Sequence, residues 1–166
     1  MTVQEAIRIR RSIRRYQSRE LPAELLDQVL EAGRLAPSAR NLQNWRFHVI
    51  RDAKLRQESA AACNGQVWIG EAPVVLVISE TDNRLMGCGQ PMGTMNASIA
   101  VSYMTLAAAE AGLGTCWIGS FKADELHKLL GLPEEETIVA VTPLGYPAES
   151  PEARPRQPRE AIVIEH

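Results

Sequence analysis

The segment PVVLVIS at residues 73–79 is the feature that most limits how this chain can fold. It is a continuous run of aliphatic, largely β-branched residues, without the alternation of a strand that has one face in water. Such a run is typical of a strand buried on both faces. We therefore expect a central strand in a sheet that is covered on each side. With 166 residues, the chain is long enough to bury such a core.

Five segments are predicted to be helical. Residues 22–35 repeat leucine and valine at helical spacing, and Pro22 suits the first helical position. Residues 95–111 hold a single charge, Glu110, among small apolar side chains, as in a helix buried on several sides. Their interspersed polar residues argue against a membrane span. The other predicted helices are residues 2–9, with Thr2 and Glu5 as a capping box, 53–62 and 123–130.

Short apolar runs predict the remaining strands, at residues 47–50, 115–118, 138–142 and 161–164. Turn-forming residues predict an ordered loop at 84–94 and a rigid turn at 143–147, PLGYP. Residues 148–166 are expected to be an extended C-terminal arm that ends in the short last strand. Strands interleaved with helices predict a layered fold of mixed α and β structure in a single domain, residues 1–166.

The composition mainly excludes classes of function. Because 18 Lys and Arg are offset by 20 Asp and Glu, we expect no nucleic-acid partner. Three widely spaced cysteines and three scattered histidines form no metal-binding motif, and isolated thiols fit a reducing cytoplasm. The N-terminus lacks the features of a secretory signal. Without a GxSxG, HExxH, Walker or GxGxxG motif, difficult chemistry is more easily assigned to a cofactor than to side chains.

Two groups of arginines lie near opposite ends of the chain. Five arginines fall within residues 8–15 and three more within 154–159. One interpretation is a solvated basic arm. The other is a phosphate site, in which Ser12 adds a hydroxyl and the two groups converge on one ligand. If the first helix continued past residue 9, Arg10 and Arg14 would share one of its faces.

The loop APSARNLQNW, residues 36–45, separates the second helix from the next strand and concentrates polar side chains. Ser38, Asn41 and Gln43 can bond the edge of a planar polar ligand, and Trp45 can cover an apolar surface. The alternative is a turn rich in Ser and Asn that caps the next element. Both interpretations stay open on the loop alone.

Six segments, in the same order, resemble the FMN-dependent nitroreductase family. They are RRSIRRY at 10–16, PSARNLQNW at 37–45, EAPVVLVI at 71–78, GLGTCWIGSF at 112–121, PLGYP at 143–147 and RPRQP at 154–158. Each alone is a weak match, but six in register across nearly the whole chain are a strong one. The resemblance implies an α+β fold with three layers, in which helices flank a mixed central sheet. It also implies an intertwined homodimer with two FMN sites at its interface.

The resemblance further implies which residues bind FMN. The phosphate and ribityl end would be held by Arg10, Arg11, Ser12, Arg154 and Arg156. Arg14 would lie near the pyrimidine edge of the flavin, where a cation stabilises the negative charge of the reduced ring.

Other implied contacts surround the ring. Pro37, Ser38 and Asn41 would come from the partner subunit, with Gln43 supporting their loop. The remaining ring contacts are Trp117, Ile118, Gly119 and Ser120, with Gln66, rather than Asn64, at the middle of the flavin chain. A backbone N–H of Gly119 or Ser120 would bond flavin N5, which requires a close backbone approach.

The activity implied is that of an oxidoreductase. NADH or NADPH gives hydride to flavin N5, and a small-molecule acceptor such as a nitroaromatic or quinone then takes the electrons, in a ping-pong cycle without a catalytic side chain. The alternatives are an FMN-binding module with little turnover, or another flavin reaction such as reductive dehalogenation or flavin cleavage. One residue departs from the family pattern, since Asn44 stands where the family usually has proline. The loop around Cys88 matches no known motif. The Cys88 thiol is either redox-active or a neutral pocket residue.

Overall fold

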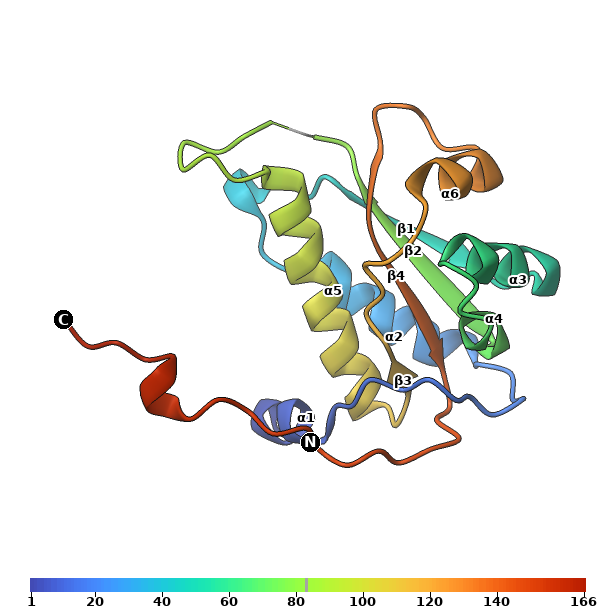
Figure 1. Ribbon diagram of the computed structural model, residues 1–166, viewed down its shortest axis with the longest axis horizontal. Coiled ribbons are helices and arrows are strands. Elements are labelled where there is room, and N and C mark those ends of the chain that lie inside the picture. The colour runs from blue at the N-terminus through green and yellow to red at the C-terminus, as the bar shows by residue number, and fades with distance from the viewer. Residues whose placement is uncertain (83) are drawn as a thin grey trace.

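The computed structural model describes residues 1–82 and 84–166, which form three layers (Figure 1). The middle layer is a sheet of β1 (Trp45–Ile50), β2 (Val74–Glu80), β3 (Gly114–Thr115) and β4 (Thr137–Gly145), in the order β1-β2-β4-β3. The pairings between these strands are antiparallel. Among the described residues, the parallel component of the predicted mixed sheet is one bridge between Ser12 and Thr115. The predicted three-layer α+β fold is confirmed.

The predicted central strand is β2, and all 7 of its residues are buried. It pairs with β1 along one edge and with β4 along the other. Because side chains alternate across a strand, Leu76 and Ile78 belong to one apolar core, and Val75 and Val77 to another. The uninterrupted apolar run therefore reflects helices on both faces of the sheet.

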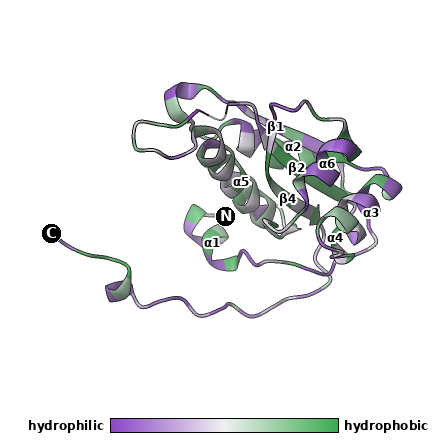
Figure 2. Cartoon of the chain, turned by 45° about the horizontal axis from the view of Figure 1, so that its top comes forward, coloured by the Kyte–Doolittle hydropathy of each residue, from purple (hydrophilic) through white to green (hydrophobic). Residues whose placement is uncertain are grey.

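The first core lies beneath α2 (Ala23–Arg34) and α5 (Met92–Glu110), which pack against one face of the sheet. The second core lies beneath α3 (Ala53–Ala62), α4 (Trp68–Glu71) and α6 (Ala123–Leu130) on the other face. Helix α1 (Val3–Ile9) contributes to neither core and packs instead on the C-terminal half of α5. Figure 2 shows the apolar residues gathered in the sheet and in the helix faces that meet it.

Several predicted elements are confirmed at their boundaries. Helices α3 and α6 span the predicted residues 53–62 and 123–130. The capping box of α1 is present, since Glu5 N donates to the Thr2 hydroxyl and Thr2 N donates to the Glu5 carboxylate. Helix α5 is buried on several sides as predicted, although it begins earlier, at Met92. Pro22 is the N-cap of α2 rather than its first helical residue.

The predicted first helix is confirmed, and it does not continue through the arginines. Helix α1 ends at Ile9, and residues 10–16 are extended. Backbone groups in this segment pair with distant chain instead of with one another: Ile13 N donates to Thr115 O, and Gln17 N donates to Tyr146 O, each at 2.9 Å. These bonds satisfy the donors that a continued helix would have used.

Three strand and turn predictions are also corrected. Residues 143–145 belong to β4 rather than to a turn, because Leu144 is buried between Val74 and Thr115. The strand expected at 115–118 is only the short β3, followed by an isolated bridge from Ile118 to Val141. Residues 161–164 form no strand. The short 3-10 helix η2 (Arg159–Ala161) ends at the first of these residues, and the exposed residues that follow it pair with no described strand.

The C-terminal arm leaves the sheet after Tyr146 and lies beside α1 before it extends away from the three layers (Figure 1). Its residues 152–166 are exposed throughout. Within residues 1–82 and 84–166, no helix is long and apolar enough to cross a membrane. In the same residues, no three or more His, Cys, Asp or Glu side chains are grouped to hold a metal ion.

Candidate functional site

The arginine-rich segment 10–16 is held between β3 and the start of the C-terminal arm. On one side it bonds to β3 through Ile13, and on the other Ala148 N donates to Arg15 O at 2.9 Å. Ile13 and Tyr16 are buried and anchor the segment to the core. Because these two side chains point inward, the arginines between and before them are turned toward the surface.

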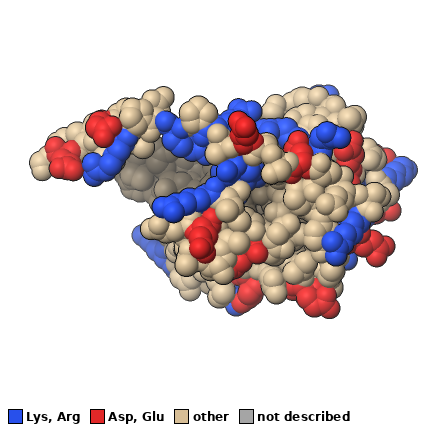
Figure 3. Space-filling model, turned by 90° about the horizontal axis from the view of Figure 1, so that it is seen from below, with Lys and Arg blue, Asp and Glu red and all other residues tan. Residues whose placement is uncertain are grey.

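Arginines from both ends of the chain line one hollow of about 410 Å³, which we call the arginine hollow. Its lining combines Ser12 with Arg8, Arg10, Arg11, Arg14, Arg154 and Arg156, against one carboxylate, Glu152. Figure 3 shows Lys and Arg side chains gathered on this face of the molecule. The predicted convergence of the two basic groups is therefore present in a single chain, and the excess of positive charge suits a phosphate.

Two arginines of the hollow are preorganised. The terminal nitrogen of Arg11 donates to the carbonyls of Arg8 and Arg10, at 2.6 and 2.9 Å, while its buried Nε has no partner among the described residues. The guanidinium of Arg14 lies 5.9 Å from the ring centroid of Trp68 and makes no ion pair with the described residues. A buried N–H without an acceptor is costly, so the orphaned Nε points to an anionic ligand that would satisfy it.

The floor beneath the arginines is uncharged. The Tyr16 hydroxyl donates to Ile13 O at 2.8 Å, and burial raises the pKa of this phenol far above its ordinary value. Burial also raises the pKa of the Cys116 thiol, although Arg14 acts in the opposite direction. Both groups are therefore neutral near pH 7, and neither offsets the positive charge of the hollow.

The residues predicted to contact a flavin ring follow β3. Ile118 is buried and exchanges two backbone hydrogen bonds with Val141, whereas Trp117 is 40% exposed. A Cβ added to Gly119 would meet no atom within 4 Å, and the Gly119 backbone is outside the left-handed region. Neither packing nor backbone conformation therefore requires glycine at this position. A glycine that leaves such a gap fits the close approach of a ligand to the backbone.

The two candidate amides near this segment are both engaged. Asn64 Nδ2 donates to the Ser120 hydroxyl at 2.9 Å, and Gln66 Nε2 donates to Cys63 O at 3.0 Å. Asn64 thus supports Ser120, a contact that its sequence position did not indicate. Gln66 retains its side-chain carbonyl for a ligand.

The loop with Pro37, Ser38, Asn41 and Gln43 lies far from the arginine hollow within one chain. Ala39 N donates to Asn96 near the start of α5, whereas α1, whose Ile7 and Arg8 line the hollow, lies at the other end, where the N-terminal amine pairs with Glu110. These two points on α5 are separated by roughly 21 Å at 1.5 Å per residue. Figure 1 shows the loop and the basic segment at opposite ends of this helix.

The end of this loop is part of the fold rather than of a ligand site. Trp45 is buried in β1 and stacks on Phe47, with 6.3 Å between ring centroids, so the interpretation of Trp45 as a ligand cover is wrong. Cys88, by contrast, is exposed in the loop that precedes α5. This loop lies at the same end of α5 as the Ser38–Gln43 region (Figure 1).

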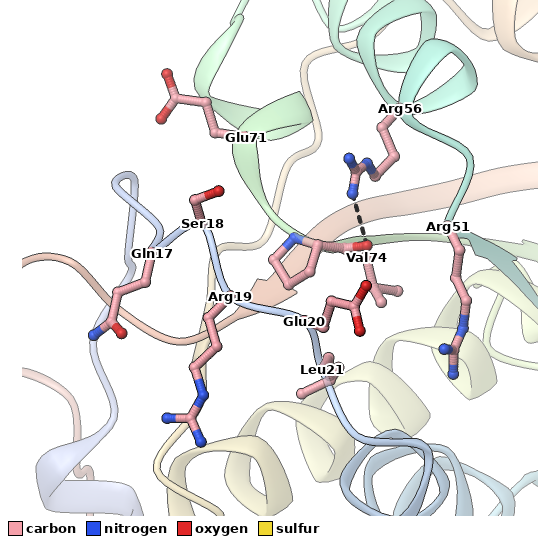
Figure 4. A pocket seen from close by; sticks show the side chains of 10 residues that line it. Gln17, Ser18, Arg19, Glu20, Leu21, Arg51, Arg56, Glu71 and Val74 are labelled. Atoms are coloured by element: carbon pink, nitrogen blue, oxygen red, sulfur yellow. Dashed lines mark hydrogen bonds between the residues drawn. The ribbon is translucent and has the colours of Figure 1, made fainter.

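A second hollow, of about 400 Å³, lies where the chain enters β2 (Figure 4). There Arg56 donates to Pro73 O at 2.8 Å and so holds the start of the strand. Cations and carboxylates are mixed in its lining, which comprises Gln17, Ser18, Arg19, Glu20, Leu21, Arg51, Arg56, Glu71, Pro73 and Val74. None of the predicted cofactor contacts belongs to it, and its two carboxylates offset two of its three arginines.

Comparison with known proteins links this arrangement to flavin enzymes. A family model described as "Nitroreductase family" matches residues 7–92 and 58–146. The chain is 34% identical to an NADH dehydrogenase of Thermus thermophilus, covering 93% of this chain and 91% of that protein. It is 32% identical to an FMN reductase [NAD(P)H] of Bacillus subtilis, covering 92% and 68%.

Two further relatives bear on the reaction. The structure of an NADPH:FMN oxidoreductase from Vibrio harveyi, complexed with NAD⁺, superposes with a TM-score of 0.90 at 27% identity, covering 98% of this chain and 76% of that one. An iodotyrosine deiodinase of Thermotoga neapolitana is 26% identical, covering 95% of this chain and 93% of that protein. The relatives of this chain thus include both reductases and a protein named as a deiodinase.

Proposed function

Because this chain belongs to the nitroreductase family and is an NAD(P)H-dependent oxidoreductase that uses FMN, we propose that its electron acceptors are nitroaromatics, quinones or similar small molecules. Bound FMN would supply the redox chemistry, a ping-pong transfer of electrons from NAD(P)H to the acceptor. The residues of the chain bind and orient this cofactor. The observation that carries the proposal is the arginine hollow, in which basic groups from both ends of the chain meet.

We assign the phosphate of FMN to the arginine hollow. Arg10, Arg11, Arg154 and Arg156 would hold it, and Ser12 would add a hydroxyl donor. Guanidinium groups bind phosphate oxygens through paired, charge-assisted hydrogen bonds, which are stronger than neutral ones. The orphaned Nε of Arg11 supports this assignment, since it is a buried donor at the edge of the hollow.

Arg14 and the Gly119–Ser120 backbone are assigned to the ring. Arg14 is free of carboxylate partners in the described chain, so its charge is available to the pyrimidine edge of the flavin. The open space at Gly119 allows a backbone N–H to reach a ring atom. A cation near the pyrimidine favours the reduced, negatively charged ring. Trp117 and Ile118 would then lie behind the ring, and Gln66 beside the middle of the cofactor.

Proton supply is assigned to solvent rather than to a side chain. The titratable groups below the hollow, Tyr16 and Cys116, are buried, and burial raises the pKa of each. A buried group with a raised pKa is a poor proton donor to an acceptor in an open site.

We also propose that the working unit is a homodimer with FMN between its subunits. The loop that carries Ser38 and Asn41 cannot reach the arginine hollow of its own chain, because α5 separates them. Pro37, Ser38 and Asn41 of the partner subunit would complete the site, and Gln43 would support their loop. In such a dimer, the arginine hollow of one subunit and the Ser38–Asn41 loop of the other would meet at one FMN, although the two lie apart within a single chain.

The C-terminal arm supports the dimer. Ile162 and Ile164 are 69% and 75% exposed, which is unusual for two large aliphatic residues so close together. A groove of about 880 Å³ between α2 and β1 is apolar at Leu30, Trp45 and Phe47, and charges of both signs line the rest of it. The exposed aliphatic side chains of the arm and the apolar part of the groove are complementary. The arm of one copy would therefore lie in the groove of the other.

The iodotyrosine deiodinase relative favours reductive dehalogenation as a second candidate reaction. The same hollow would hold FMN in either case, so the two reactions differ only in the acceptor. Release of iodide from 3-iodotyrosine, measured beside reduction of a quinone and a nitroaromatic, separates them. A third candidate, a binding module with little turnover, predicts FMN binding without steady-state NAD(P)H oxidation. A cytoplasmic location stays a prediction that rests on three free cysteines.

The decisive experiment is the visible spectrum of the purified protein with FMN, followed anaerobically during addition of NADH and, separately, NADPH. We expect flavin bands that bleach with at least one donor and return on addition of a quinone or nitroaromatic. Bands that never bleach would leave only the binding module. No bound flavin after addition of FMN would refute the proposed function.

A further inference from the structure

The loop between α2 and β1 has an unusual backbone. Arg40, Asn41 and Gln43 adopt positive φ angles of 53, 56 and 50°, although none of them is glycine. Asparagine tolerates this left-handed conformation, but arginine and glutamine adopt it at a cost in strain. Strain of this kind persists only where the surrounding structure imposes it, and such sites are concentrated at functional positions.

Bonds within the loop account for part of its conformation. The Ser38 hydroxyl accepts from Gln43 N at 3.1 Å, and Gln43 Nε2 donates to Asn41 O at 3.1 Å. The 3-10 turn adds a bond from Asn41 N to Ser38 O at 3.0 Å. These contacts fix the loop relative to itself, but not relative to the helices and the sheet.

One side chain fixes both ends of the loop to the fold. Asn96, on α5, is 2% exposed, and its Oδ1 accepts from Ala39 N at 2.9 Å at the start of the loop. Its Nδ2 donates to Asn44 Oδ1 at 2.8 Å at the end of the loop. The carbonyl of Asn44 also accepts from Thr81 N at 2.9 Å, which ties the same residue to the end of β2.

The residue at position 44 makes this arrangement possible. Asn44 is buried, and it supplies the side-chain acceptor that Asn96 bonds. A proline at this position could not supply it, because its side chain has no hydrogen-bond acceptor. Without Asn44, the donor of Asn96 would be buried and unsatisfied, so the two amides depend on each other.

We propose that Asn96, together with Asn44, is a positioning residue for the flavin: its amide clamps both ends of loop 38–43 and so sets where Ser38 and Asn41 meet the cofactor of the partner subunit. This inference rests on the proposed function, because the loop touches FMN only in that dimer. The clamp acts through the loop and not on the cofactor itself. Loss of the clamp should relax the strained residues and move the Ser38 and Asn41 side chains away from the geometry that binds the ring.

The test compares Asn96→Leu with Asn44→Ala. Leucine is similar in size to asparagine but has neither a donor nor an acceptor. Aspartate is avoided because a new carboxylate would lie one turn from Gly93, where the buried Glu80 carboxylate already packs. Asn44→Ala removes one half of the clamp and keeps the bond from Ala39 to Asn96. Ser102→Ala is the control, since the Ser102 hydroxyl is exposed and bonds only to Ser98 O within α5.

Three measurements decide the result: FMN affinity from quenching of flavin fluorescence, visible circular dichroism of the bound flavin, and hydrogen exchange of the FMN-free protein. For Asn96→Leu we expect FMN affinity to fall about tenfold or more, as for loss of two buried hydrogen bonds. The amides of Ala39 and Gln43 should exchange at least about tenfold faster, from local opening of the loop. The flavin dichroism should change, Asn44→Ala should show smaller effects in the same direction, and Ser102→Ala should match the wild type.

A purely structural role gives a different pattern. It would lower the melting temperature of Asn96→Leu but leave FMN affinity and flavin dichroism of the folded protein at wild-type values, and that result would overturn the proposal. Unchanged exchange at Ala39 and Gln43 would overturn it as well, whether or not FMN binds. Failure of the wild type to bind FMN would instead refute the proposed function. The exchange rates of the FMN-free protein would still show whether Asn96 holds the loop.

Discussion

The Glu149 carboxylate accepts a hydrogen bond from the backbone N–H of Arg14, with 2.5 Å between the two atoms. This contact joins residues that are 135 positions apart in the sequence. It uses the backbone of Arg14 and leaves the guanidinium without an ion pair in the described chain. The C-terminal arm is thereby held against the basic segment, so that both groups of arginines face one hollow.

We predict that Glu149→Ala weakens FMN binding about tenfold, since a hydrogen bond to a charged group contributes roughly 1.5–3 kcal/mol. The loss should come from release of the arm, which carries Arg154 and Arg156, rather than from the cofactor contacts themselves. Fluorescence titration with FMN measures it. Glu149→Gln keeps an acceptor and should restore most of the affinity. Equal affinity in wild type and Glu149→Ala would show that the arm does not depend on this contact.

Arg10→Ala should weaken FMN binding more than riboflavin binding, because the two ligands differ only in the phosphate. Its guanidinium lines the hollow and makes no hydrogen bond within the described residues, so its removal leaves the local bonding intact. We expect FMN affinity to fall about tenfold to 100-fold, as for loss of a charge-assisted hydrogen bond, and to become less sensitive to salt. Arg51→Ala removes an arginine from the other hollow and serves as the matched control. Parallel losses for both ligands would place the phosphate elsewhere.

Local patterns in the sequence were sufficient for the framework of the fold. The uninterrupted run of β2, the capping box of Thr2 and Glu5 and the left-handed Gly131 are each determined within a few residues. Such features follow from steric and hydrogen-bonding preferences of the chain itself. They predicted the central strand and the ends of α1 and α6 without knowledge of the tertiary structure.

The remaining features depend on contacts between distant residues. The arginine segment has side chains spaced for a helix, yet its backbone pairs with Thr115 and Tyr146 and is therefore extended. The approach of Trp68 to Arg14 has no local signal at all. Asn96 did have a local signal in the sequence, because the polar groups of an amide in a largely apolar helix need hydrogen-bond partners when they are buried. Its partners, however, could be identified only from the folded chain.

Alkaline pH should destabilise the protein in part through Cys63. Burial raises the pKa of this thiol to about 11, above the value near 9 expected in the unfolded chain. The neutral thiol is therefore favoured by folding below pH 9, and this stabilisation is lost as the pH rises from about 9 through 11. Denaturant unfolding at pH 8 and pH 10.5 should show a larger fall in the free energy of unfolding for wild type than for Cys63→Ala. Identical falls in both proteins would contradict the assignment to Cys63; the cavity left by alanine affects both pH values alike.

Gly119 separates the demands of folding from those of cofactor binding. An added Cβ would meet no atom within 4 Å, and the backbone conformation is one that other residues adopt. Gly119→Ala should therefore leave the cofactor-free protein as stable as wild type, or more stable by about 0.4–1 kcal/mol, because alanine reduces the entropy of the unfolded chain. If the backbone at this position contacts the flavin ring, the same methyl group occupies space that the ring needs.

FMN affinity should then fall about tenfold for Gly119→Ala and further for Gly119→Val, as the ring is displaced from the backbone donor. Gly87→Ala is the matched control, since Gly87 also has open space around its missing Cβ and lies outside the left-handed region. It should show the same effect on stability, measured by denaturant unfolding, and no effect on FMN affinity. Wild-type FMN affinity in both Gly119 variants would show that the backbone of this residue does not contact the flavin. A loss of stability in the cofactor-free Gly119→Ala protein would instead show that the glycine is required for folding.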